Sequence, residues 1–414
     1  MYKKILPIIS IMMILAFVLA ACGGGTTTAE EPVAEEPVAE EPVAEEPVAV
    51  DMAVTLNLWH AYQTGSSEEA TLTTLVANAM AAYPGLTINV LQVPFDQMFN
   101  KYQTEAAAGG GPDLFVAPND SLGDFARAGL VAALDEALAG RLDHYTQVGI
   151  DGMMVDGVMY GIPESAKLVA LYYNTSLVAT PPTTTDELYA AVEAGEQITF
   201  FVGAYHLFGW AGSFGGQLFD ADSRCVADQG GWVEAANYLL SLKDLGAQFS
   251  SDYGAMEAPF RAGETAYWPN GPWALADYMT DLGDNLGVVP LPAGPDGSPA
   301  TPFLGIDGYY VNPNSLVFDQ AVELGLYLTG AESAQIYTDT AGHIPVRDDV
   351  TVTNPLIQQF VVASQTGYFR PQTTEFSNFW TPFGDMWTQI IEAVETPEVA
   401  VPAACTAMNT ANGK

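Results

Sequence analysis

Histidine and cysteine, the residue types most often found in metal sites and nucleophilic centres, are few in this chain of 414 residues. The four histidines, His60, His144, His206 and His343, are scattered, and no CxxC or HxxxH spacing occurs. The patterns GxSxG, HExxH and GxxxxGK[ST], which mark serine hydrolases, zinc proteases and phosphate-binding loops, are also absent. The sequence therefore predicts no metal, no cofactor and none of these catalytic centres.

Carboxylates are abundant, with 42 acidic residues after residue 50. A glycosidase needs two of them about 5–9.5 Å apart, and a pair such as Asp120 with Glu164 is easily nominated. A carbohydrate-active hydrolase is therefore one alternative function. Residues 220–228 weakly resemble a calcium loop, but they lack the glycine at the turn and the closing bidentate glutamate, which favours a polar hairpin turn.

Alternating strands and helices surround the first of these carboxylates. Residues 54–59, 86–91 and 113–117 predict strands, and residues 67–82 and 96–108 predict helices, the first opened by a serine cap. A βαβα order indicates a parallel sheet covered by helices, which binds ligands at the carboxyl ends of its strands. The residues just after two strands, 60–64 and 118–120, are therefore candidates for a binding site.

The N-terminus indicates export. Two lysines precede an apolar run over residues 5–17, which is too short to span a membrane. The following Leu-Ala-Ala-Cys resembles the bacterial lipoprotein box, so residues 1–21 are expected to be a lipoprotein signal peptide and Cys22 the site of lipidation. Membrane attachment through that lipid implies an extracytoplasmic location.

Residues 22–50 contain four copies of Glu-Glu-Pro-Val-Ala. Proline and like charge at this density predict a disordered, extended tether. From residue 51 on, the composition becomes globular, and 42 acidic residues face only 10 basic ones. A surface this anionic repels nucleic acid and anionic lipid headgroups.

Six short blocks occur in a fixed order along the chain: GPDLFVAPND at 111–120, FARAGLV at 125–131, VMYGIP at 158–163, ALYYN at 170–174, FRAGETA at 260–266 and NGPW at 270–273. Together they resemble the sugar-binding lipoproteins that serve ABC importers, in the maltose/maltodextrin-binding group of solute-binding proteins (family 1). The resemblance extends from about Leu56 to the last predicted helix.

The resemblance implies a two-lobed α/β fold, in which each lobe is a mostly parallel sheet flanked by helices. The first lobe is expected to comprise residues 51–165 plus 309–354, and the second lobe residues 170–303 plus 355–414. Hinge segments would cross between the lobes near residues 165–169, 304–308 and 352–354. Such a protein is expected to be a monomer that closes over its ligand.

The resemblance also implies a set of ligand-binding residues. A pyranose presents an apolar face that stacks on aromatic rings and hydroxyls that need planar donors and acceptors. Positions matching the family's stacking residues are Tyr205, Trp273 and Trp380, although a tryptophan can also simply fill the core. Asp120 matches a hydroxyl-binding carboxylate, or else caps the helix that follows it.

At four positions the sequence departs from the maltose-binding pattern, which argues against maltose itself as the ligand. Gln63 replaces an acid, Lys167 a glutamate, Arg370 a methionine, and Ala117 a tryptophan. The two basic residues are expected to donate to sugar oxygens or to a ligand carboxylate or phosphate. A neutral sugar is the first interpretation and an acidic sugar, or another small solute, the second.

Cys225 and Cys405 are the two cysteines left once Cys22 is assigned to a lipid. Both map to the second lobe of an exported protein, where they are candidates for a disulfide; two separate buried thiols are the alternative. The sequence as a whole predicts a lipid-anchored receptor, not an enzyme, that binds a small saccharide and delivers it to an ABC transporter permease. A tethered hydrolase and a surface adhesin are the rivals.

Overall fold

The computed structural model of the protein describes residues 50–414. The predicted signal peptide, the lipidation site at Cys22 and residues 22–49 of the tether lie outside the described residues. Among the residues that are described, no helix has the length and apolar character to cross a membrane.

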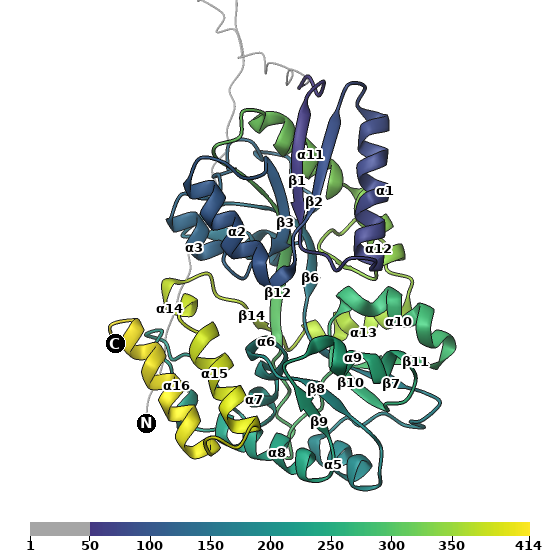
Figure 1. Cartoon of the computed structure of the whole chain (residues 1–414), viewed down its shortest axis with the longest axis vertical. Helices are drawn as coiled ribbons and strands as arrows, with labels where there is room; N and C mark the ends of the chain where they lie inside the picture. The colour runs from purple at the N-terminus through teal and green to yellow at the C-terminus, as the bar shows by residue number, and fades with distance from the viewer. Residues whose placement is uncertain (1–49) are drawn as a thin grey trace, which may run out of the picture. The chain divides into compact units, whose positions relative to one another are not determined.

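The first lobe begins with the predicted order of strands and helices (Figure 1). Its first five elements are β1 (Thr55–His60), α1 (Ser67–Ala82), β2 (Thr87–Gln92), α2 (Phe95–Ala107) and β3 (Leu114–Pro118). Helix α1 starts where it does because the Ser66 hydroxyl accepts a hydrogen bond from the Glu69 amide at 3.3 Å. Its apolar residues Leu72, Leu75 and Val76 are buried against the sheet side of the lobe.

Further elements complete this lobe. They are α3 (Leu122–Arg127), α4 (Gln147–Gly152), β4 (Met154–Val155), β5 (Val158–Met159), β6 (Ile162–Lys167), β12 (Phe303–Val311), α11 (Phe318–Leu328), α12 (Ala331–Ala341) and β13 (Ile344–Pro345). The strand order of the sheet is β13-β6-β12-β3-β1-β2. Strands β2, β1 and β3 are parallel, whereas β12 runs antiparallel to both β3 and β6.

The second lobe is built around a smaller sheet. Its elements are β7 (Ala170–Asn174), α5 (Thr185–Glu193), β8 (Thr199–Phe201), α6 (Ala204–Phe208), α7 (Trp210–Ser213), η1 (Ala227–Gln229), α8 (Trp232–Asp244), β9 (Gln248–Ser250), α9 (Tyr253–Arg261), β10 (Tyr267–Asn270), η2 (Pro272–Ala274), α10 (Leu275–Leu282), η3 (Gly283–Asn285), β11 (Leu286–Val289), α13 (Pro355–Ser364), β14 (Tyr368–Phe369), α14 (Thr374–Ser377), α15 (Trp380–Ile391) and α16 (Pro397–Ala411).

The sheets correct one detail of the sequence prediction, which expected mostly parallel strands in each lobe. In the second lobe β7 pairs antiparallel with both β10 and β11, and the short β8–β9 and β12–β14 pairs are parallel. In the first lobe the antiparallel partner is β12, which enters the sheet from the other lobe and therefore runs against β3. The two-lobed α/β fold itself is confirmed.

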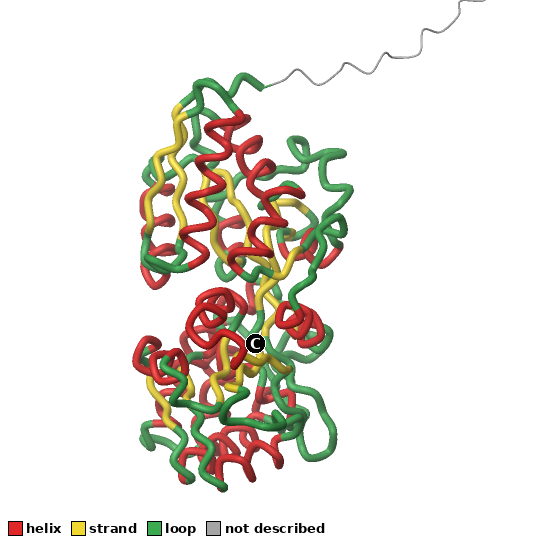
Figure 2. Tube along the Cα trace, turned by 90° about the vertical axis from the view of Figure 1, so that its right-hand side faces the viewer, coloured by secondary structure: helices red, strands yellow, loops and turns green. Residues whose placement is uncertain are grey.

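Three chain segments cross between the lobes (Figures 1 and 2). The first passes from β6 directly into β7, the second is β12, in which all nine residues are buried, and the third is the segment between β13 and α13. The start of β12 pairs with β14, and its end pairs with β3. The lobes also pack against each other where α12 ends at Gly342 (φ +83°), because a Cβ there would lie 2.9 Å from Leu275 on α10.

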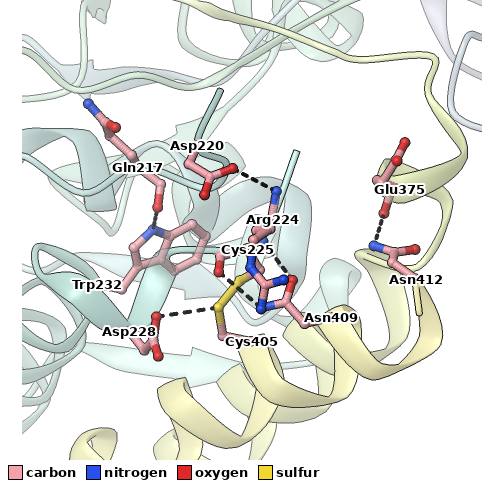
Figure 3. The surroundings of a disulfide bond; sticks show 10 residues. All are labelled: Gln217, Asp220, Arg224, Cys225, Asp228, Trp232, Glu375, Cys405, Asn409 and Asn412. Carbon is pink, nitrogen blue, oxygen red and sulfur yellow. Dashed lines mark hydrogen bonds between the residues drawn. A yellow bond between two sulfur atoms is a disulfide. The ribbon is translucent and has the colours of Figure 1, made fainter. Parts of the chain in front are cut away.

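Cys225 and Cys405 form a disulfide within the second lobe (Figure 3). It joins helix α16 to a hairpin whose strands meet at Phe219 and Cys225. The Asp220 carboxylate closes this hairpin by accepting the amides of Asp222 and Arg224, each at 2.9 Å. The segment that weakly resembled a calcium loop is thus a polar turn, and the described residues contain no cluster arranged to hold a metal ion.

Candidate functional site

The predicted ligand-binding residues come from both lobes and from the crossing strands. Gln63 follows β1, Asp120 follows β3, and Lys167 ends β6. From the second lobe come Tyr205 on α6, Trp273 in η2, Arg370 just after β14 and Trp380 at the start of α15. Six of these seven side chains gather in two neighbouring groups, one aromatic and one ionic, while Gln63 stands apart.

The aromatic group surrounds Phe303, the first residue of β12. The ring centroid of Phe303 lies 6.1 Å from that of Tyr205 and 5.8 Å from that of Trp380. Tyr205 in turn lies 6.0 Å from Trp273. Both tryptophans are only partly buried, so each retains ring surface accessible to solvent. Partly exposed rings at the meeting point of two lobes can serve as stacking platforms.

Hydrogen bonds to the Tyr253 hydroxyl hold the Trp273 indole in place. Its indole N–H donates to the Tyr253 hydroxyl at 3.1 Å, and the Asn270 amide donates to the same hydroxyl at 2.7 Å. His206 packs edge-on to the indole at 5.8 Å, and burial lowers the pKa of His206 to about 4, so its ring is neutral at pH 7. The ring plane of Trp273 is therefore fixed before any ligand arrives.

Arg370 occupies the centre of the aromatic group. Its guanidinium carbon lies 5.2 Å from the Tyr205 ring centroid and 5.6 Å from that of Trp380. The side chain is buried, and a Cβ on Gly305 would come within 2.6 Å of its Nη2 atom, so only glycine leaves room for it. Burial lowers the pKa of Arg370 to about 9, which keeps the group charged at pH 7.

The charge of Arg370 is already compensated. It forms an ion pair with Asp120, and its Nη1 atom donates to Asn119 Oδ1 at 3.1 Å. The Asp120 side chain remains 19% exposed, and the buried Nε–H of Arg370 has no hydrogen-bond partner. Asp120 and Arg370 were predicted as separate ligand contacts. In the structure they form one ion pair, in which the Nε–H of Arg370 and the exposed edge of Asp120 remain free to form hydrogen bonds.

Lys167 is the centre of the ionic group. Its ammonium lies 2.7 Å from Asp307 Oδ2 and 3.1 Å from Glu68 Oε1. Burial alone would lower the pKa of Lys167, but these two carboxylates outweigh it and raise the pKa above its usual value. The ammonium also lies 5.9 Å from the ring centroid of Trp273, which links the ionic group to the aromatic one.

Glu164, nominated with Asp120 as a catalytic pair, is fully engaged elsewhere. One carboxylate oxygen lies 2.8 Å from His343 Nδ1, and the other accepts the Ser165 hydroxyl at 2.6 Å. The residue is buried. A carboxylate with both oxygens satisfied and no exposure is poorly placed as a general acid or base.

Two predicted positions contribute little to either group. Gln63 is exposed, and its backbone carbonyl closes the turn before α1 by accepting the Ser66 amide at 3.0 Å. Ala117, which replaces a tryptophan of the maltose-binding pattern, is buried within β3. A concavity of about 540 Å³ elsewhere in the second lobe, beside the N-terminus of α8, is lined by none of the predicted ligand-binding residues.

Residues 74–359 match the model of a family described as bacterial extracellular solute-binding protein. The chain belongs to this family. Family membership assigns it to the extracytoplasmic binding proteins, and the relatives described next are binding proteins rather than enzymes.

This solute-binding protein is 27% identical over 362 residues to the maltotriose-binding protein of Pyrococcus abyssi, covering 83% of this chain and 78% of the relative. It is 22% identical to the galactooligosaccharide-binding protein of Bacillus subtilis, covering 82% of this chain and 86% of the relative. The Thermus thermophilus maltotriose-binding protein, solved with maltotriose, superimposes with a TM-score of 0.78 at 25% identity, covering 86% of this chain and 100% of that one.

Several residues of the site escaped the sequence analysis. Asp307, Glu68 and His343 form the ionic group with Lys167, and Phe303 and Asn119 support Arg370. Glu68 lies in the first turn of a helix, where acids are common, and His343 stands alone between α12 and β13. Asp307 carried one signal, since a charged residue within the apolar stretch 303–311 needs a buried partner.

Proposed function

We propose that this solute-binding protein is the saccharide receptor of an ABC importer. It binds a small saccharide between its lobes, closes over it and presents the closed form to a membrane permease. The observation that carries this proposal is the aromatic group: Trp273, Tyr205 and Trp380 converge from the second lobe on the Arg370–Asp120 pair. A pyranose requires aromatic rings that stack on its apolar face. Beside them it requires charged groups that form hydrogen bonds with its hydroxyls.

Each group takes a different part of the sugar in this proposal. Trp273 and Trp380 stack on sugar faces, Asp120 accepts from hydroxyls through its exposed edge, and Lys167 donates to a sugar oxygen beside Trp273. The names of relatives that bind maltotriose and galactooligosaccharide support this ligand class. Gln63 reaches the sugar only if closure brings the second lobe to its loop.

A neutral sugar suits the charges better than an acidic one. Lys167 and Arg370 together face three carboxylates, those of Asp307, Glu68 and Asp120. An anionic ligand would have to compete with these carboxylates for both cations. We therefore propose an uncharged saccharide, and an acidic sugar is the alternative.

The cellular setting is proposed from the sequence. Cys22 carries the lipid, residues 22–50 form the tether, and the lobes divide at the boundaries given above. Similarity to a solute-binding lipoprotein of Streptococcus pneumoniae, 23% identical over 336 residues, supports the lipid anchor. The receptor acts as a monomer beside its permease, and its anionic surface makes nucleic acid an unsuitable partner.

A thermal-shift screen tests the ligand class. The purified protein is heated with maltose, maltotriose, maltotetraose and galactooligosaccharides, each at several concentrations. A true ligand at a hundredfold excess over its dissociation constant adds about 2.7 kcal/mol to the stability of the fold, which gives a clear rise in melting temperature. Product analysis of the same mixtures checks for hydrolysis. No shift with any saccharide, or turnover of one, contradicts the proposal.

A further inference from the structure

His343 lies between two carboxylates deep in the first lobe. Its Nδ1 atom is 2.8 Å from Glu164 Oε1, and its Nε2 atom is 2.8 Å from Glu68 Oε1. The side chain is only 1% exposed, so water cannot replace either contact. Ionised carboxylates only accept hydrogen bonds, and a neutral imidazole has a single N–H. Both contacts are hydrogen bonds only if the ring carries two protons.

The ring is also fixed in orientation. It stacks on Tyr337 with centroids 4.8 Å apart and planes 4° from parallel, and Tyr62 meets it edge-on at 6.2 Å. The Tyr337 hydroxyl lies 3.0 Å from that of Tyr309 on β12. His343 thus connects helix α1, strand β6 and the segment after α12 at a single point.

The charges around His343 leave no alternative cation for Glu164. Glu68 shares one oxygen, Oε1, between His343 and Lys167, and Lys167 also pairs with Asp307. Three carboxylates therefore face two cations. The charged or titratable groups around the ring are Glu68 from α1, Tyr62 from the loop before α1, Glu164 and Lys167 from β6, Asp307 and Tyr309 from β12, and Tyr337 from α12.

Lys167 connects this buried network to the proposed sugar site. Its side chain is 12% exposed, and its ammonium lies 5.9 Å from the ring centroid of Trp273 in the other lobe. The position of that ammonium is set by Glu68 and Asp307, and the position of Glu68 is set in turn by His343. Loss of the second proton from His343 would place a nitrogen lone pair against a carboxylate and push one of the two glutamates away.

We propose that His343, as an imidazolium, is a positioning residue for saccharide binding: it holds Glu68, and through Glu68 the ammonium of Lys167, beside Trp273. The inference rests on the proposed function. Burial alone would lower the pKa of His343, but Glu164 and Glu68 outweigh it and raise the pKa to about 9. The positioning therefore holds at neutral pH and fails in alkaline solution.

Two measurements on the purified protein test the inference. Nitrogen NMR of the histidine rings, assigned with His343→Gln, is expected to show a doubly protonated His343 ring at pH 7 that titrates near pH 9. Calorimetry with maltotriose is expected to show a dissociation constant that rises about tenfold by one pH unit above that titration point. His343→Gln is expected to bind maltotriose weakly at pH 7 and to lose this alkaline pH dependence.

Controls separate the inference from the fold and from the proposed function. His144→Gln alters an exposed histidine and is expected to leave affinity and its pH dependence unchanged. Circular dichroism at each pH confirms that the protein is folded. A His343 ring that titrates near pH 6.5, or wild-type affinity that is constant to pH 10, overturns the positioning role while the receptor stands. Failure of the wild type to bind maltotriose or any other saccharide of the screen at pH 7 instead removes the proposed function.

Discussion

The two cations between the lobes, Arg370 and Lys167, are accommodated in different ways. Arg370 has one carboxylate partner, Asp120, and three aromatic rings around its guanidinium, and its Nε–H has no partner. Lys167 has two carboxylate partners and belongs to a network that continues through Glu68 to His343. The first region is aromatic with hydrogen-bonding capacity to spare, and the second is polar with an excess of carboxylates.

The difference indicates what each region is for. The unused Nε–H and the partly exposed rings at Arg370 suit a site that binds a ligand directly. The network that joins α1, β6 and β12 suits a connection that holds the ammonium of Lys167 beside Trp273. The two histidines follow the same division, since His206 is kept neutral beside Trp273 while His343 is kept protonated beside Glu164.

Removing each cation should show this difference most strongly. Lys167→Met leaves Glu68 and Asp307 buried without their ammonium, and we expect a loss of about 3–5 kcal/mol in the free energy of unfolding. Arg370→Met leaves Asp120 at a partly exposed position, where water solvates it, and we expect a loss of about 1–3 kcal/mol. Urea denaturation measures both, with the surface variant Lys101→Met as the control. An equal or larger loss for Arg370→Met would remove the distinction.

The disulfide separates stability from binding. Replacing Cys225 and Cys405 by serine should cost about 2–5 kcal/mol of stability, because the bridge closes a loop of 180 residues. It joins α16 to the hairpin of residues 219–225, and neither element contains a predicted ligand-binding residue, so maltotriose affinity of the folded variant should stay unchanged. Thiol titration of the denatured, unreduced wild type should find no free thiol at these two cysteines. Two free thiols would refute the bridge.

The two histidines should give pH effects of opposite sign. The fold resists protonating His206 until about pH 4 while the unfolded chain accepts the proton near 6.5, so the free energy of unfolding falls as pH decreases through this range. For His343 the stabilisation is present below about pH 6.5 and is lost as pH rises through about 9. Urea denaturation against pH should show a shallower acid limb in His206→Asn and a shallower alkaline limb in His343→Gln. An acid limb unchanged in His206→Asn and an alkaline limb unchanged in His343→Gln would contradict these opposite pH effects.

Salt should have the smallest effect. Both cations are already paired, so maltotriose affinity should change by less than about twofold between low and high ionic strength. Calorimetry at two salt concentrations measures this, with Arg370→Gln as the companion variant. A steep loss of affinity in salt that disappears in Arg370→Gln would indicate a charged ligand instead.

Local features of the fold could be predicted from sequence. Alternation of apolar residues located β1 within one residue, and Ser66 marked the start of α1 because capping is a property of adjacent residues. The antiparallel pairing of β12 with β3 could not be predicted. Strand β12 begins some 185 residues after β3, and its direction depends on its entering the sheet from the second lobe.

The candidate site was nominated by residue type, and the contacts between its residues were not foreseen. Tyr205, Trp273 and Trp380 were nominated, and the structure brings all three near Arg370 or Lys167. That Lys167 pairs with Asp307, or that His343 bridges Glu164 and Glu68, joins residues up to 275 positions apart. Sequence periodicity does not predict such contacts, because the partners of buried charged groups are close in space but distant in the sequence.

Calorimetric titration of Trp273 variants with maltotriose tests whether the aromatic group binds the saccharide. We expect saturable binding to the wild type, a loss of about 1–3 kcal/mol of binding free energy in Trp273→Ala, and substantial recovery in Trp273→Phe, which keeps a flat ring. Trp380→Ala should behave like Trp273→Ala. Unchanged affinity in both alanine variants, with the fold intact by circular dichroism, would contradict the claim that these rings form the binding site.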